Sequence, residues 1–343
     1  MQRETNLPLV AALAIGGAAL TYLAAIGLDP YALSVLEFMG INIILAVSLN
    51  LTNGLTGLFS LGHPGFMAVG GYTAALLTIP AARKAALLPA LPDWLAAQSW
   101  SFLPALLAGG VCATGTALLI GYPVLRLRGH YLAVATLGFI IIVETVIINL
   151  PSYTRGALGL NGLAPLTEAW WVYGWVVVTL YVCWKLKHSS RGRTMLALRE
   201  NEMAAQCLGV NVTTTRLLAF CLGAFFAGVA GGLWGHLVTI VTPHSFSILM
   251  AFNLVVMVVL GGSGSISGAV LAAIGLTIAT EAMRPLEEGL ELYGLSQILI
   301  AIGVLMTLLY RPKGLFGSGE HARLTRAAPP VHGPIGGPIA DKT

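Results

Sequence analysis

The sequence predicts an all-α integral membrane protein with about ten transmembrane helices, one or two of them interrupted or re-entrant. Hydrophobic residues make up 57% of the 343 residues and charged residues only 9%, against roughly 25% in an average globular chain. The apolar residues also fall into long runs, close to the roughly 20 residues that one bilayer crossing requires. The 41 glycines favour close approach of helices in lipid.

Ten apolar runs are predicted to be these transmembrane helices. The third and the eighth are shorter than the rest. In chain order the runs are Leu9–Leu28, Leu33–Leu51, His63–Ile79, Phe102–Tyr122, Tyr131–Leu150, Trp170–Leu186, Leu217–Ile240, Ile248–Leu260, Ile266–Met283 and Leu295–Tyr310.

Basic residues indicate the orientation of the predicted helices. With the N-terminus in the cytoplasm, the loop with Arg126 and Arg128 and the loop at residues 185–216 both lie inside, in agreement with the positive-inside rule. The loop with Arg83 and Lys84 falls outside and disagrees with the rule. We therefore expect both termini to be cytoplasmic.

Two glycine-rich segments interrupt the apolar pattern. Leu51–Pro64 reads LTNGLTGLFSLGHP and is either a broken helix beside a transport site or a tight loop at the membrane surface. Gly261–Gly268, GGSGSISG, is more typical of an ordinary loop. Polar side chains crowd the first segment, so we predict that they line a translocation path; they are Asn50, Asn53, Ser60 and His63.

The loop at residues 185–216, here called the polar loop, contains a stretch with helical spacing. Over Arg193–Leu208 the apolar residues recur at helical intervals. A short helix on the cytoplasmic face of a membrane protein needs a partner to contact. The apolar positions of this predicted helix are Met195, Leu198, Met203 and Leu208.

Two carboxylates fall within predicted transmembrane helices, where burial in lipid is costly. Glu144 lies deep in the fifth and Glu37 near the outer end of the second. Either could carry a proton in a self-sufficient secondary transporter, and Glu144 could line the translocation path. A hydrogen bond between helices or a side chain reaching the interface is the alternative.

Several kinds of chemistry leave no signature in the chain. There is no G-x-x-x-x-G-K-[ST] motif for nucleotide phosphates, no H-E-x-x-H and no G-x-S-x-G. The histidines do not pair at metal-ligand spacing, and the positive charge sits in loops. We therefore expect no enzyme activity, no metal or cofactor bound by this chain and no nucleic-acid partner.

Several motifs follow one another in an order that resembles a known family. They are GLTGLFSLGHPGFMAVGGYTAALL (Gly54–Leu77), RLRGHYLAVATLGF (Arg126–Phe139), RGRTMLALRENEMAAQCLGVNVTTTRLLAF (Arg191–Phe220), then VTPHSFS, VVLGGSGSISGAVLAA and YRPKGLF. Together these segments resemble the LivM-like permease subunits of ABC importers for branched-chain amino acids. The resemblance runs from about Val35 to Phe316.

This resemblance implies a transmembrane permease domain over residues 1–316 and a tail at 317–343, whose composition is typical of disorder. It implies a bacterial plasma (inner) membrane protein that works with a second homologous (LivH-like) permease, two cytoplasmic ATPase subunits that hydrolyse ATP, and an extracytoplasmic solute-binding protein. In the family, the segment that matches the polar loop docks on the ATPase. The residues here that match its motif are Glu202, Ala204, Ala205 and Gly209. Arg193 and Arg199 belong to the same predicted coupling helix, where their charges can fix the register of docking.

The chain departs from the family pattern at a few positions. Ile141 and Glu144 replace a carboxylate and an arginine, Arg155 replaces a glycine, and His244 stands where an acidic residue is usual. Related permeases carry urea, amides or other amino acids, so these solutes stay open as alternatives to branched-chain amino acids.

Overall fold

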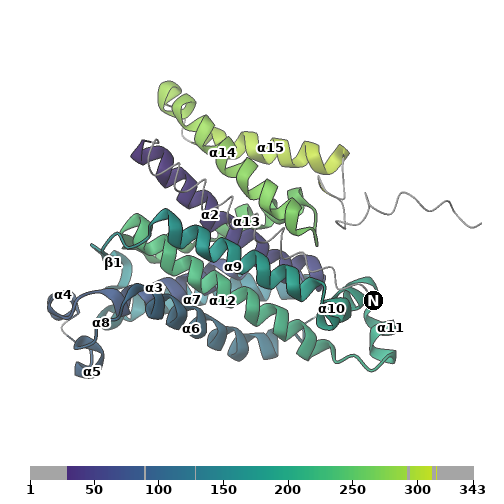
Figure 1. Ribbon diagram of the computed structural model, residues 1–343, viewed down its shortest axis with the longest axis horizontal. Coiled ribbons are helices and arrows are strands. Elements are labelled where there is room, and N and C mark those ends of the chain that lie inside the picture. Colours follow the sequence, from purple (N-terminus) through teal and green to yellow (C-terminus); the bar gives the residue numbers. More distant parts are fainter. Residues whose placement is uncertain (1–28, 89, 128, 292–293, 311–313, 315–343) are drawn as a thin grey trace, which may run out of the picture.

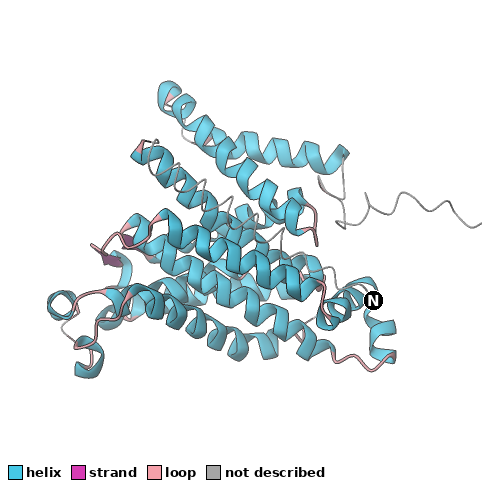
Figure 2. Ribbon diagram, viewed as in Figure 1, coloured by secondary structure: helices cyan, strands magenta, loops and turns pink. Residues whose placement is uncertain are grey.

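The computed structural model of the protein describes residues 29–310 apart from 89, 128 and 292–293, together with Gly314. Helices dominate this part of the chain (Figure 2). The longer helices run side by side in a bundle, with α10 and α11 at one end and α4, α5 and α8 at the other (Figure 1). The helices are α2 (Pro30–Asn50), α3 (His63–Thr78), α4 (Ala81–Leu87), α5 (Asp93–Ala96), α6 (Phe102–Val124), α7 (His130–Asn149), α8 (Pro151–Thr154), α9 (Ala169–Lys187), α10 (Ser190–Glu200), α11 (Glu202–Cys207), α12 (Val212–Val238), α13 (Ile248–Gly261), α14 (Ile266–Leu290) and α15 (Leu295–Tyr310).

Shorter elements connect these helices. A π-helical turn, η1 (Leu51–Leu55), continues α2, and two 3-10 turns, η2 (Gly156–Leu158) and η3 (Pro243–Phe246), lie in the loops. Strands β1 (Leu160–Asn161) and β2 (Ile240–Val241) form an antiparallel pair, with Leu160 opposite Val241 and Asn161 opposite Ile240. This pair holds the loop before α9 against the end of α12.

The helical class of the fold is confirmed, but the count of ten transmembrane helices is not. The described residues contain seven helices that are long and apolar enough to cross a membrane, or eight if α3 and α4, which meet at 117°, form one crossing. The predicted run Leu9–Leu28 and the tail at 317–343 lie outside the described residues. Each of the other nine predicted runs forms a helix, of which α15 has only 16 residues.

The centre of the bundle is a glycine seam between α3, α6 and α12. A Cβ atom placed on Gly70 would overlap the backbone of Gly228, and one placed on Gly231 would overlap the carbonyl of Met67. A Cβ atom on Gly109 would lie 2.7 Å from the carbonyl oxygen of Gly70. Glycine is therefore required here because the backbones of the three helices touch, as small residues permit in lipid.

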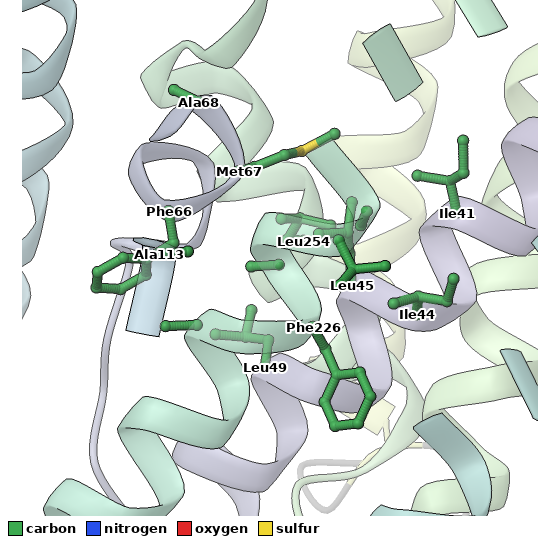
Figure 3. Packing of buried hydrophobic residues seen from close by; sticks show 14 of the residues in the cluster. Ile41, Ile44, Leu45, Leu49, Phe66, Met67, Ala68, Ala113, Phe226 and Leu254 are labelled. Carbon is green, nitrogen blue, oxygen red and sulfur yellow. The ribbon is translucent and has the colours of Figure 1, made fainter. Parts of the chain in front are cut away.

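Large apolar side chains fill the space around the seam. Leu45 and Leu49 of α2 point toward side chains of α3, α12 and α13, and Leu254 lies among them (Figure 3). Leu45, Phe66 and Met67 have no exposed surface, and Leu254 has 1%. These contacts fix α13 against α2 and α3.

The connection from α3 to α6 explains the basic loop that disagrees with the positive-inside rule. Lys84 is fully buried, and its Nζ donates to the carbonyl oxygens of Leu95 (3.3 Å) and Gln98 (2.5 Å). Burial lowers the pKa of this ammonium group. Arg83 donates to the carbonyl oxygen of Gly162. Both side chains hold loops together.

Candidate functional site

Two interruptions of the helical bundle meet at the end that carries α10. The first break, residues 51–62, comprises η1 and the chain that leads to α3, and the second break, residues 262–265, joins α13 to α14. Asn50 links them, because its Nδ2 donates to the carbonyl oxygen of Ser265 and its Oδ1 accepts from the backbone N–H of Gly264, both at 2.8 Å. Asn50 is only 2% exposed, so both bonds are shielded from water.

Most of the first break is packed inside the protein, although Gly57 and Phe59 are exposed. Thr52 and Ser60 are fully buried. Asn53 closes the loop on itself: its Nδ2 donates to the carbonyl oxygen of Ser60 and its Oδ1 accepts from the Ser60 N–H, both at 3.1 Å. Thr136 of α7 accepts a further bond from the N–H of Leu61 at 3.0 Å. Buried backbone groups at such a break need these partners.

The polar loop bonds directly to both breaks. The guanidinium of Arg199 in α10 donates to the carbonyl oxygens of Gly54 (2.8 Å) and Ser263 (3.3 Å). Lys187, at the end of α9, donates to the carbonyl oxygen of Gly264 at 2.8 Å. The side chain of Arg199 is 20% exposed. It therefore lies turned into the protein, whereas the family resemblance led us to expect it on the surface that meets an ATPase.

The single helix predicted over Arg193–Leu208 is wrong, because α10 and α11 are separate helices. The backbone of Asn201 is extended, and its Oδ1 accepts from the N–H of Ala204 at 3.0 Å, which caps the start of α11. At its other end Gly209 has φ +82°, and the N–H of Val210 bonds the carbonyl of Ala205 at 3.1 Å. This pattern ends a helix and suits glycine.

The two helices of the polar loop divide the predicted apolar positions between them. Met195 and Leu198 of α10 are 0% and 2% exposed, so they anchor this helix to the bundle. Met203 on α11 and Leu208 just after it are 69% and 83% exposed. Ala204 is also exposed, while Ala205 packs inward. The outer side of α11 and the residue after it thus leave apolar groups exposed, a property of interaction surfaces.

An ion pair holds α11 against the start of α12. Glu202 Oε2 lies 2.8 Å from Nη2 of Arg216. Both side chains border a cavity of about 460 Å³, whose other walls come from the first break and from the α6–α7 connection. Its lining is completed by Gly57, Leu58, Phe59, Leu127, Gly129 and Leu132.

His63 stands apart from the other polar residues near the first break. It is 1% exposed, and neither of its ring nitrogens has a hydrogen-bond partner among the described residues. The same holds for Oγ1 of Thr52. A Cβ atom on Gly223 would lie 3.0 Å from that oxygen and 3.3 Å from Cε1 of His63. A role of His63 in a translocation path stays a prediction.

Glu144 of α7 contacts a histidine on another segment. Helix α7 ends at Asn149, and Oε1 of Glu144 lies 2.8 Å from Nδ1 of His244 in η3. The other carboxylate, Glu37 of α2, is 5% exposed. The pairing of Glu144 was not predictable, since nothing in the sequence relates it to a histidine on another segment. The same is true of the bonds of Arg199 and Asn50.

Comparison with known proteins places the chain in a family. Residues 31–307 match the family model described as branched-chain amino acid transport system / permease component. The chain is 34% identical over 309 residues to the high-affinity branched-chain amino acid transport system permease protein LivM of Salmonella typhimurium, covering 80% of this chain and 67% of the relative. The protein belongs to this permease family.

Two further relatives extend the comparison. LivM of Escherichia coli is 33% identical over the same proportions of both chains. The permease protein LivH of Salmonella typhimurium is 24% identical over 298 residues, covering 81% of this chain and 91% of the relative. No solved structure matches the chain.

Proposed function

We propose that this chain is a permease subunit of an ATP-driven importer for branched-chain amino acids. It pairs with a second homologous permease, receives solute from an extracytoplasmic binding protein, and is driven by two cytoplasmic ATPase subunits that bind the ATP. The relatives named LivM and LivH support the solute and the pairing of permeases. The protein lies in a bacterial inner membrane with both termini on the cytoplasmic side, the orientation that the positive-inside rule favours.

One observation carries the mechanism: the polar loop is bonded to both helix breaks. Arg199 reaches the carbonyls of Gly54 and Ser263, while the apolar residues on and after α11 remain exposed. A partner that grips α11 and moves on hydrolysing ATP would shift α10 through the short connection at Asn201. The shift would then act on both breaks, where regular helical hydrogen bonding is already interrupted.

Uptake by purified protein in liposomes tests this proposal. We expect liposomes with the complete importer to transport radiolabelled leucine only when ATP is supplied on the side of the ATPase subunits. Liposomes with this chain alone should transport none. Gly209→Pro and Glu202→Arg should abolish ATP-dependent uptake, because one distorts the end of α11 and the other breaks its ion pair with Arg216. Membrane insertion should be normal in both. Normal uptake by either variant would remove the coupling role.

The same assay separates the alternatives. A self-sufficient secondary transporter would take up solute with a pH gradient and no ATP, and Glu144→Gln would abolish that uptake. A related importer for urea, amides or other amino acids would leave leucine outside, and an excess of the true solute would compete with any residual leucine transport.

A further inference from the structure

The middle of α13 carries an exposed amide side chain. Asn253 lies well inside this helix and is exposed. No hydrogen bond to its side chain is found among the residues that the structure describes. The next residue, Leu254, points into the core (Figure 3). Around Asn253, the side chains of Leu249 and Phe252 are each 51% exposed, so the amide belongs to a wider open face of the helix.

An amide without a partner is strongly unfavourable in hydrocarbon. Helix α6 shows what a face suited to lipid looks like in this chain, because its exposed residues from 103 to 119 are all apolar or carry only a thiol. They are Leu103, Pro104, Leu107, Val111, Cys112, Gly115, Leu118 and Leu119. The exposed face of α13 differs from that of α6 because it carries the amide of Asn253. This amide would be unfavourable in contact with lipid.

More polar groups lie where η3, the segment before α13, contacts α7. The segment η3 leads into α13, and its His244 pairs with Glu144 of α7 at 2.8 Å. The side chain of His244 is 71% exposed. Thr145 and Asn149 of α7 are exposed as well. Exposed polar groups thus stand at the end of the bundle opposite α10 and again at the middle of α13, with the exposed apolar Leu249 and Phe252 between them.

Most polar side chains near the first break are less free to meet a solute. Asn50, Asn53 and Ser60 already bond backbone groups that would otherwise be unsatisfied. If these side chains bonded the solute instead, the backbone groups of the break would lose their hydrogen-bond partners, which is unfavourable. By contrast, Asn253 and His244 offer polar atoms on an open surface.

We propose that the open side shared by α7 and α13 lines a hydrated passage for solute, and that Asn253 contacts the solute midway. Its amide can donate to the carboxylate and accept from the ammonium group of a zwitterionic amino acid. The Glu144–His244 pair lies at one mouth of the passage. This inference rests on the proposed function, because it names residues that the transported solute touches.

Thiol labelling of the assembled importer in membranes tests whether water reaches this face. In a background in which Cys112, Cys207 and Cys221 are alanine, Asn253→Cys should react with a charged, membrane-impermeant methanethiosulfonate, and leucine should slow the reaction. Leu119→Cys is the matched control, since Leu119 is 78% exposed on the apolar face of α6. It should react only with a lipid-soluble maleimide. Asn253→Cys behaving like this control would overturn the inference.

Transport kinetics test the contact itself. Asn253→Leu should raise KM for leucine about tenfold, the effect of losing one hydrogen bond of about 1.4 kcal/mol, with Asn253→Gln closer to the unmodified protein. If Asn253→Leu accumulates poorly in the membrane, Asn253→Ala replaces it. An unchanged KM in the apolar variant contradicts the contact. The labelling reaction does not depend on ATP. If residue 253 is accessible to water but the importer shows no ATP-driven leucine uptake, the proposed function is refuted while the hydrated passage is not.

Discussion

Arg199 and Gly54 lie 145 residues apart in the sequence and are joined by a hydrogen bond of 2.8 Å from Nη1 to the backbone carbonyl oxygen. The donor belongs to α10, in the polar loop, and the acceptor to the first break. The same guanidinium also reaches Ser263 in the second break. A single charged side chain therefore connects three segments that the bundle brings to one end.

Removing this connection should separate ATP hydrolysis from transport. Arg199→Gln is expected to lower leucine uptake by the assembled importer at least tenfold, because a hydrogen bond from a charged group contributes about 1.5–3 kcal/mol. The ATPase rate should stay within about twofold, since α11 and its exposed residues are untouched. Uptake and phosphate release are measured in the same proteoliposomes.

The matched control for this variant is Arg191→Gln, which removes an exposed positive charge from the same helix. Its uptake and ATPase rate should both be unchanged. Equal losses of uptake and hydrolysis in Arg199→Gln would show that Arg199 is needed for assembly of the complex and not for coupling ATP hydrolysis to transport.

The exposed apolar residues on and after α11 should determine binding of the ATPase. Leu208→Asp is expected to reduce the amount of ATPase that copurifies with the permease more than tenfold, because burying a leucine contributes about 1.5–3 kcal/mol. Thermal stability of the isolated permease should not change, since Leu208 is 83% exposed.

Ser190→Asp, at the exposed start of α10, introduces the same charge in the same loop and should leave copurification intact. If Leu208→Asp retains the ATPase, a different surface of the permease makes the contact.

The glycine seam should be intolerant of even one methyl group. Gly231→Ala brings a Cβ atom into the carbonyl of Met67 and is expected to destabilise the fold by about 1–3 kcal/mol, the usual effect of overpacking. The melting temperature in detergent and the amount of protein in the membrane report this loss.

Gly115→Ala is the control, because no heavy atom lies within 4 Å of a Cβ atom placed there. Alanine favours the helix by up to about 1 kcal/mol over glycine, so its melting temperature should be equal or higher. Similar melting temperatures for the two variants would contradict the close contact of α3 with α12.

The helical class and the position of most helices could be predicted from the sequence, because a run of about 20 apolar residues by itself indicates a helix that can cross a membrane. The run at 102–122, for example, became α6 with both ends within two residues. The break near Gly54 was visible for the same local reason, since glycine, proline and hydroxyl residues cluster there. The boundary at Asn201 was missed, because the apolar spacing continues across it while the side-chain cap interrupts the helix.

The bonds that build the site were beyond such reasoning. Arg199, Asn50 and Glu144 each pair with residues on distant segments. Their partners are backbone N–H and C=O groups or a histidine, and nothing in the sequence marks them as partners. The count of crossings was also uncertain for a physical reason: α3 turns by 117° into α4, and hydropathy alone does not report direction.

The glycine seam restricts how the permease can change shape. Where backbones touch, sliding or tilting of one helix past another meets steric resistance from main-chain atoms, which cannot move aside as flexible side chains do. Helices α3, α6 and α12 should therefore travel as one rigid body during each transport cycle. Rotation between inward-open and outward-open states must then occur at hinges outside the seam, and the positive-φ glycines 262 and 264 between α13 and α14 are suited to provide one.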